Sequence, residues 1–337
     1  MDWFEKLTGF PEAGYEETKD KLIVADRRLH SRVNDASYGV GEIELVSLGT
    51  LRTRAQLAGP PRGQLKASVV TGDVRAMHSD PLHADALFQV ASQFNLLEMV
   101  GPDVTPEQGV TRYQFDRTQG PACAMAAGAA TIFRNYFVPV GGSRGQTASR
   151  QIDAIQELGA VLSEAVGMQI DALWTMRNGY VLVTQPGLEA ISGYLRTIST
   201  AELDKLRAKL CIGVHSDVEV TDVEGSKPQF VSQAFCSALP VAYNRVRGPH
   251  WEPFARLVLE AAYEATIWSG VLNARRGASN IVFLTFLGGG AFGNAEDWID
   301  AAINRSLHLA ARFDLDVRLV SYGKPSANKL KLVEKFK

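Results

Sequence analysis

The densest group of residues that could do chemistry lies in the segment Val-His-Ser-Asp-Val-Glu-Val-Thr-Asp, residues 214–222. Alternation of apolar and polar residues predicts a strand with His215, Asp217 and Glu219 on one face and the valines toward the core. Asp222 follows just past its end. Carboxylates that share a site raise one another's pKa and attract a cation. The segment is therefore a candidate for acid–base chemistry or guanidinium binding, and a solvated strand face is the equally weighted alternative.

A second feature is a glycine-rich loop between a buried strand and a helix. The loop reads Gly-Gly-Gly-Ala-Phe-Gly-Asn over residues 288–294, after an apolar run over residues 281–287. Glycines let backbone N–H groups approach an anion, and the N-terminus of a following helix adds a favourable dipole. We expect a phosphate or diphosphate there. The loop lacks the Gly-Lys-Ser/Thr of a P-loop, and a glycine turn without a ligand stays open as the alternative.

Other familiar chemistry is not indicated. The spacing of His215, Asp217 and Glu219 selects no particular cation, so we expect neither a required metal nor a cofactor. The three cysteines are far apart and odd in number, which favours neither a disulfide framework nor a structural zinc site. No Gly-x-Ser-x-Gly nucleophile motif occurs.

Composition places the chain among globular proteins. It has 337 residues, 46% of them hydrophobic and 21% charged, enough for a sizeable core. A formal net charge of -2 gives no reason to expect nucleic acid as a partner. The N-terminus does not resemble a secretory signal, and the longest apolar stretch, residues 281–292, is too short to span a membrane. We therefore expect a cytoplasmic protein that binds neither nucleic acid nor membrane.

Apolar runs bounded by turn residues alternate with helical patterns along the chain, which predicts an α/β fold with parallel strand pairing. The predicted strands cover residues 41–48, 65–70, 86–91, 180–184, 210–220, 231–243, 281–287 and 317–321. The predicted helices cover residues 119–136, 148–175, 188–209, 251–273 and 297–312. The basic C-terminal tail is expected to be solvated.

Three segments, in the same order along the chain, resemble the macrodomain family. Residues 69–74, Val-Val-Thr-Gly-Asp-Val, resemble the family's Gly-Asp-Ile strand end, and residues 84–95 resemble the Asp-Ala-Ile-Val-Asn-Ala-Ala-Asn strand that follows. The loop over residues 288–294 resembles the second phosphate loop, and Tyr322 stands where an aromatic side chain faces adenine. The resemblance implies a mixed, mostly parallel sheet flanked by helices that binds ADP-ribose.

The resemblance also implies roles for particular residues. Asp73 falls where the family contacts the adenine amino group. Glu98 closes the loop expected beside the ribose, and it joins Asp217, Glu219 and Asp222 as a catalytic candidate. The other expected ADP-ribose contacts are Gln93, Phe94, Asn95, Gly120, Gly288, Gly289, Gly290, Ala291, Phe292, Gly293, Asn294 and Tyr322.

The chain departs from the family in its first loop, which usually carries a run of glycines. Here residues 93–98, Gln-Phe-Asn-Leu-Leu-Glu, lead through a long polar segment to the Gln-Gly-Pro of residues 119–121. Together with the N-terminal segment and residues 118–124 and 235–243, this is similar to the divergent, larger MavL-like macrodomains. Known members of that group remove ADP-ribose from arginine.

We accordingly predict one enlarged macrodomain-like domain over residues 1–337, with an N-terminal extension over residues 1–40 and a helical insertion over residues 148–210. The predicted function is hydrolysis of the N-glycosidic bond of mono-ADP-ribosylated arginine, with ADP-ribose and a modified protein as partners. A non-catalytic ADP-ribose reader and an ADP-ribose-phosphate phosphatase are the alternatives. A dinucleotide-dependent oxidoreductase is disfavoured because no early GxGxxG motif with a ribose-binding acid is found.

Overall fold

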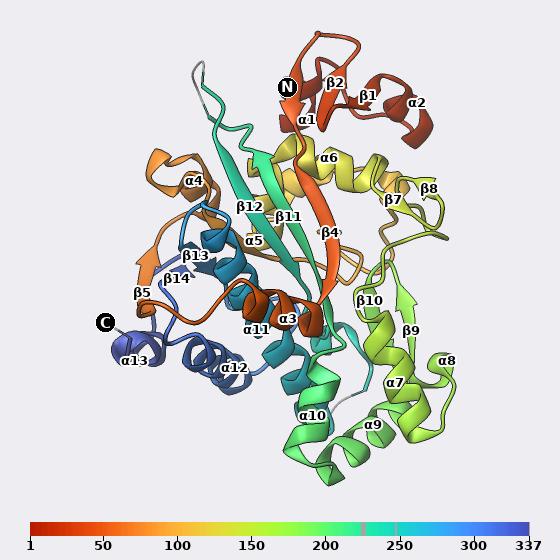
Figure 1. Ribbon diagram of the computed structural model, residues 1–337. Coiled ribbons are helices and arrows are strands. Elements are labelled where there is room, and N and C mark those ends of the chain that lie inside the picture. The colour runs from red at the N-terminus through yellow and green to blue at the C-terminus, as the bar shows by residue number, and fades with distance from the viewer. Residues whose placement is uncertain (224–226, 247, 337) are drawn as a thin grey trace.

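The computed structural model describes residues 1–223, 227–246 and 248–336. Within these residues the centre is a seven-stranded sheet of order β4-β11-β12-β6-β13-β14-β5 (Figure 1). From β12 to β5 neighbouring strands are parallel, whereas β11 pairs antiparallel with β12 and β4. The predicted mixed, mostly parallel α/β sheet is confirmed. The strands are β4 Glu42–Ser47, β5 Lys66–Thr71, β6 Leu87–Ala91, β11 Cys211–Glu219, β12 Phe230–Cys236, β13 Ile281–Leu284 and β14 Asp316–Ser321.

Helices cover both faces of this sheet, because successive residues of the buried strands point to opposite sides. On β6, Leu87 lies beside Gly270 of the long helix α11, whereas Phe88 stacks on His78 of α4. Among the described residues no helix combines the length and the hydropathy needed to cross a bilayer. The helices around the sheet are α3 Leu48–Leu57, α4 Val74–Ser79, α5 Gln119–Ala126, α6 Gly128–Tyr136, α11 Trp251–Arg275, α12 Glu296–Leu309 and α13 Ala327–Glu334.

Residues 1–40 pack on the rest of the chain through an apolar cluster, and most of its buried members lie in residues 97–137, which include α5 and α6. Glu12 accepts hydrogen bonds from the backbone N–H groups of Val110 and Thr111 and from the hydroxyl of Tyr136. These contacts anchor the segment that follows Glu98. The elements are α1 Trp3–Thr8, α2 Tyr15–Asp20 and a three-stranded antiparallel sheet of β1 Leu22–Ala25, β2 Arg28–Ser31 and β3 Ser37–Gly39.

Residues 148–210 contain helices and a hairpin. The prediction of helix from 148 to 175 is wrong at both ends, because long-range hydrogen bonds take the backbone groups there. Ala154 donates to the carbonyl of Phe94 and accepts from Cys211, while residues 174–177 pair with β10. Asn178 and Gly179 turn this hairpin with positive φ at both positions, as an Asn-Gly turn favours. The elements are α7 Gln156–Val166, α8 Ile170–Leu173, β9 Trp174–Arg177, β10 Tyr180–Val183, α9 Gln185–Thr197 and α10 Thr200–Arg207.

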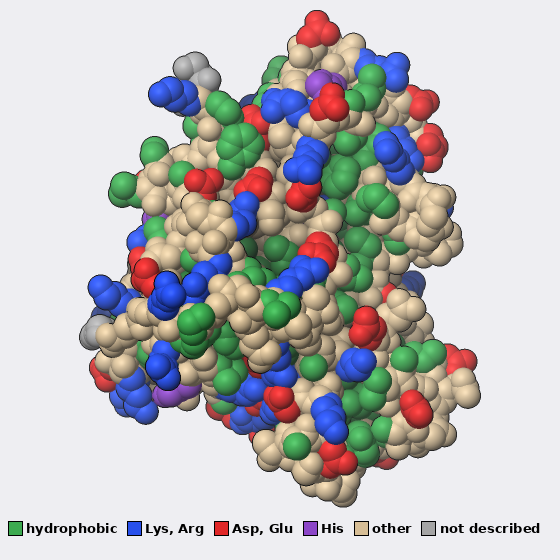
Figure 2. All heavy atoms as spheres, in the orientation of Figure 1, with side chains coloured by type: hydrophobic (Ala, Val, Ile, Leu, Met, Phe, Trp, Pro, Cys, Tyr) green, Lys and Arg blue, Asp and Glu red, His purple; other side chains and the backbone are tan. Residues whose placement is uncertain are grey.

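The chain after several strands differs from expectation. The predicted strands over residues 231–243 and 281–287 end earlier, at Cys236 and Leu284. The apolar residues Ala238, Leu239 and Leu287 that follow are buried as well, but in loops. The basic tail is not simply solvated: it forms α13, and Val333 and Phe336 are buried against the sheet. Burial of these apolar side chains, rather than solvation of the lysines, therefore determines where the tail lies. On the face shown in Figure 2, acidic and basic side chains are interspersed.

Candidate functional site

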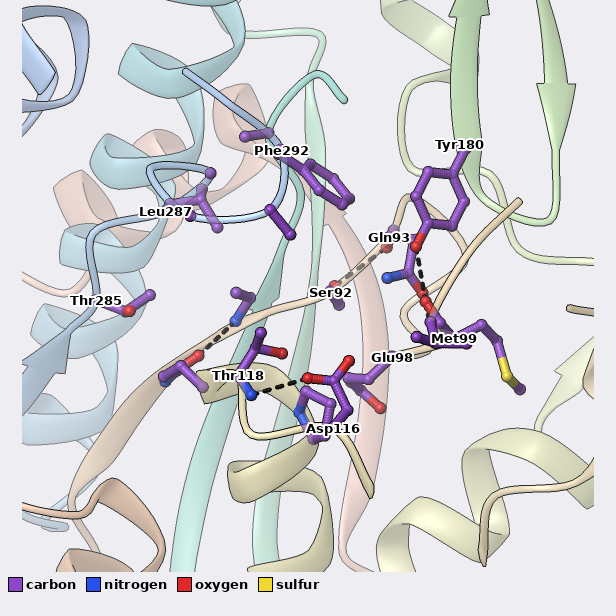
Figure 3. Close-up of a pocket in the computed structure, with 18 of the residues that line it drawn as sticks. Ser92, Gln93, Glu98, Met99, Asp116, Thr118, Tyr180, Thr285, Leu287 and Phe292 are labelled. Carbon is purple, nitrogen blue, oxygen red and sulfur yellow. Dashed lines mark hydrogen bonds between the residues drawn. The ribbon is translucent and has the colours of Figure 1, made fainter. Parts of the chain in front are cut away.

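A cavity of about 290 Å³ lies where β6, β12 and β13 end (Figure 3). Its lining includes Ser92 and Gln93 after β6, Ala238 after β12 and residues 285–288 and 290–292 after β13. The first residues of α5 close another side. Because parallel strands end at the same edge of a sheet, segments almost 200 residues apart in sequence meet there, and ligands of open α/β sheets bind at this edge.

A second hollow of about 420 Å³ continues from this cavity. Asp116, Thr118, Gln119, Thr285 and Phe286 line both, so the two form one cleft. We call the first part the glycine-loop end. The second part we call the Asp73 end.

The Asp73 end lies beyond β5 and β14, where Asp73 and Tyr322 line it. Asp73 caps α4, since its Oδ1 accepts from the N–H of Arg75 at 2.8 Å. Its Oδ2 has no hydrogen-bond partner among the described residues. A free carboxylate oxygen at this place can accept from an amino group of a ligand. Tyr322 is 87% exposed, so one face of its ring is open to stacking.

The glycine loop supplies unpaired donors. Gly288, Gly290, Ala291 and Phe292 line the cavity, and their backbone N–H groups donate to none of the described residues. Such a group of free N–H donors suits an anion. The helix that follows the loop contributes less than expected, because Glu296 and Asp297 in its first turn already complement its dipole.

Gly289, Gly293 and Asn294, the other predicted loop contacts, do not line the cleft; they shape the loop. The N–H groups of Gly289 and Gly293 donate to Phe286 and Gly290, and the buried Asn294 side chain donates to Leu239 and Gly288. These donated hydrogen bonds hold the loop and tie it to Leu239, while Asn294 Oδ1 is buried without a partner in the described part of the chain.

Glu98 lines the same cavity and is only 2% exposed. Burial raises the pKa of its carboxyl group to about 7, and this outweighs the attraction of the Arg134 guanidinium, whose Nη2 lies 3.3 Å from Oε2. At neutral pH both protonation states of Glu98 are therefore populated. A carboxyl group of this kind, open to a cavity, can act as a general acid or base.

The turn that carries Glu98 is held by hydrogen bonds. Leu96 has a positive φ of 63°, a conformation that costs free energy for a bulky residue. Arg134 Nε donates to the Leu96 carbonyl, Gln93 Oε1 accepts from the N–H of Met99, and the Tyr180 hydroxyl donates to the Met99 carbonyl. The surroundings therefore impose the conformation that places Glu98 at the cavity.

Three further predicted ligand contacts belong to this framework. Phe94 is 1% exposed and packs in the core, and the side chain of Asn95 bonds to Gln151 and to the N–H of Leu97. Gly120 lets α5 approach β6, since a Cβ there would lie 1.9 Å from the Ala91 carbonyl oxygen. Of the residues predicted in this part of the chain, the structure places Gln93 and Glu98 in the cavity lining.

The acidic strand segment does not form one site. A β-bulge between His215 and Val218 breaks the expected alternation, and Asp217 there has a φ of 56°. The prediction that His215, Asp217 and Glu219 share one face is therefore wrong. His215 is buried against the Val40 carbonyl, and burial and then Arg134 lower its pKa to about 3.

Each of the three carboxylates is paired with an arginine of the chain itself. Asp217 pairs with Arg276 at 2.7 Å. Asp222 binds Arg75 through both carboxylate oxygens. Glu219 lies 3.6 Å from Arg28 and accepts from the N–H of Gly39. None of the three lines either end of the cleft; Asp222 lines an adjoining space, where Arg75 already occupies both of its carboxylate oxygens.

Three aromatic rings form a wall of the glycine-loop end, of which the sequence indicated only Phe292. Tyr180 and Tyr243 complete it, with ring centroids 5.1–5.6 Å apart in all three pairs. Figure 3 shows Tyr180 and Phe292 at the cavity. The three aromatic residues come from separate parts of the chain, so no local sequence pattern predicts that they meet. Only the Asn-Gly turn before Tyr180 indicated a hairpin at that position.

No protein-family model matches the chain, and no curated protein sequence matches it. Among solved structures it is similar to poly(ADP-ribose) glycohydrolase from Deinococcus radiodurans in complex with ADP-ribose, at 13% identity over 87% of this chain and 93% of that one, with a TM-score of 0.44. It is also similar to the glycohydrolase from Thermomonospora curvata, at 12% identity over 96% of both chains, with a TM-score of 0.43. At these values the likeness by itself assigns neither a substrate nor a reaction.

Proposed function

We propose that this chain binds ADP-ribose along the cleft and hydrolyses the glycosidic bond that joins the ribose to a protein side chain. The observation that carries the proposal is Glu98, a buried carboxyl group with a pKa of about 7 in the same cavity as four unpaired N–H donors. Diphosphate on those donors would bring the adjoining ribose toward Glu98.

The binding mode follows from the chemistry of the two ends. The free Oδ2 of Asp73 accepts from the adenine amino group, with Tyr322 available to stack on the ring. The N–H groups of Gly288, Gly290, Ala291 and Phe292 receive the diphosphate. This order along the cleft agrees with the macrodomain resemblance in the sequence.

In the reaction, protonated Glu98 gives its proton to the departing atom of the side chain as the bond to the anomeric carbon breaks. The resulting carboxylate takes a proton from the water that attacks that carbon, which restores the acid. Charge builds up on the ribose in an oxocarbenium-like transition state. Arg134 orients the carboxyl group, and its charge stabilises the carboxylate once the proton has left.

The linkage we propose is arginine, as the MavL-like resemblance implies. Because Asp217, Glu219 and Asp222 lie outside the cleft, the carboxylate we assign to the guanidinium is Asp116. It lines the cavity, and its Oδ1 accepts from the N–H of Thr118 at 2.8 Å. Its Oδ2 has no partner in the described part of the chain and can accept from a guanidinium.

Calorimetry with ADP-ribose tests the binding site without assuming a target protein. Absence of binding at millimolar concentration would eliminate both the hydrolase and the reader. Release of ADP-ribose is then measured from arginine-, aspartate/glutamate- and serine-linked proteins and from ADP-ribose polymer. Release from arginine alone is the expected result; binding without release from any substrate identifies a reader, and phosphate release from ADP-ribose phosphate identifies a phosphatase.

A further inference from the structure

Positive charge is distributed unevenly along the cleft. In the described part of the chain, no lysine or arginine lines the glycine-loop end. The Asp73 end is lined by three, Arg75, Arg117 and Lys329, which outnumber its two carboxylates, Asp73 and Asp116. The diphosphate would thus be bound by backbone N–H groups, while side-chain cations gather at the other end.

The three cations differ in their ion pairing. Arg75 is bound to Asp222 through two hydrogen bonds. Arg117 and Lys329 form no ion pair with a described residue, although the charge of Lys329 partly offsets the rise in the pKa of the Asp300 carboxyl group. Unpaired cations that line a concave surface attract an anion, and an arginine can bind phosphate oxygens through two N–H groups.

Lys329 is held at the cleft by its surroundings. Its ammonium lies 3.7 Å from the centroid of the Phe286 ring, which lines both ends of the cleft. The helix that carries it, α13, is anchored through Val333 and Phe336. Arg117 approaches from a different part of the chain, just before α5. Two independently positioned cations therefore converge on one hollow.

The hollow also has an extension. A further space of about 290 Å³ shares Arg75, Gln114 and Met125 with the Asp73 end. Its other lining residues include Lys6, Tyr38 and Thr221 and the carboxylates of Asp2 and Asp222, so it is polar. A group attached to a ligand at the Asp73 end has room to continue into it.

We infer that the Asp73 end accepts a phosphate carried on the ribose of adenosine, in addition to the diphosphate at the glycine loop. The inference rests on the orientation of ADP-ribose in the proposed function. Arg117 and Lys329 contact this extra phosphate. Two sources share the chemistry. One is a phosphate on the 2′-hydroxyl of the adenosine ribose. The other is the diphosphate of a second ADP-ribose unit joined to that hydroxyl through its own ribose, which would place this diphosphate further toward the extension.

The test compares ligands that differ by one phosphate, by calorimetry at low ionic strength on the full chain. Adenosine 2′,5′-bisphosphate is compared with adenosine 5′-monophosphate, and ADP-ribose 2′-phosphate and the ADP-ribose dimer are compared with ADP-ribose. We expect the added phosphate to tighten binding by about 10-fold or more. The Arg117→Gln/Lys329→Gln variant should lose this gain. Lys331→Gln, an exposed lysine of the same helix that does not line the cleft, should keep it.

The outcomes separate this inference from the proposed function. If ADP-ribose binds but the added phosphate brings no gain with any ligand, or a gain that survives in the double variant, the inference is overturned and the proposed function stands. If ADP-ribose does not bind and the bisphosphate still binds more tightly than the monophosphate, the phosphate site stands and the proposed function fails. A gain with the 2′-phosphates identifies the first source, and a gain with the dimer alone identifies the second.

Discussion

Replacing Glu98 by glutamine should stabilise the protein above neutral pH and at the same time slow turnover strongly. Burial raises the pKa of Glu98 from 4.5 to about 7, which corresponds to about 3 kcal/mol of folding free energy. Because the folded chain binds this proton more tightly than the unfolded chain, the stabilisation is complete below pH 4.5 and is lost as the pH rises through 7. Glutamine mimics the neutral acid at every pH. The variant should therefore match the parent near pH 4 and exceed it by about 3 kcal/mol at pH 8.

Urea unfolding of the parent and of Glu98→Gln, measured from pH 4 to pH 8, gives this difference directly. Glu189→Gln, an exposed change on α9, is the matched control and should show no such trend. In the same preparations, ADP-ribose release should fall by a factor of about 10² or more in Glu98→Gln. The parent rate should decline as the pH rises above 7, because the proton donor is lost. A stability difference that does not grow with pH, or a variant that releases ADP-ribose at the rate of the parent, would refute the reasoning.

Three other substitutions test other parts of the structure. Asp73→Asn can keep the helix cap but presents an N–H₂ group to adenine, so calorimetry should show ADP-ribose binding weakened by about 1–3 kcal/mol without loss of the fold. Gly290→Val should abolish ADP-ribose binding, because its side chain would occupy the space of the diphosphate. Thermal stability should not change, since a Cβ there meets no protein atom within 4 Å; unchanged affinity would show that the loop is only structural. Glu264→Gln leaves Arg52 and Arg305 without their buried carboxylate, so urea unfolding at pH 7 should show a loss of about 3–5 kcal/mol. Burial alone would raise the pKa of Glu264, but hydrogen bonds from these arginines lower it below its usual value, so this loss should shrink as the pH falls through that lowered pKa.

Local patterns were sufficient for most of the sheet and for the glycine loop. The strands before and after the loop were predicted because a buried parallel strand is a short apolar run between turn residues, which is a feature of neighbouring residues alone. The predicted strands were too long where buried residues continue past the true strand end, as in residues 237–239 and 285–287. A buried loop and a buried strand have the same composition, so the sequence pattern does not distinguish them. The tail was misjudged for a related reason, since lysines around Val333 and Phe336 masked residues that pack on the sheet.

By itself the sequence determined the α/β fold and the position of the glycine loop, because both depend on residue types at short spacing, and its resemblance to macrodomains pointed to Asp73 and Glu98 as candidates. Only the tertiary structure decided which carboxylates reach the cleft. A single bulge turned Asp217 away from the face of His215, and arginines distant in sequence paired with Asp217, Glu219 and Asp222. Glu98, by contrast, is buried by segments that the sequence does not connect, and that burial gives its carboxyl group a pKa at which it can transfer a proton. Burial and ion pairing depend on which distant segments meet, and no pattern among neighbouring residues encodes that.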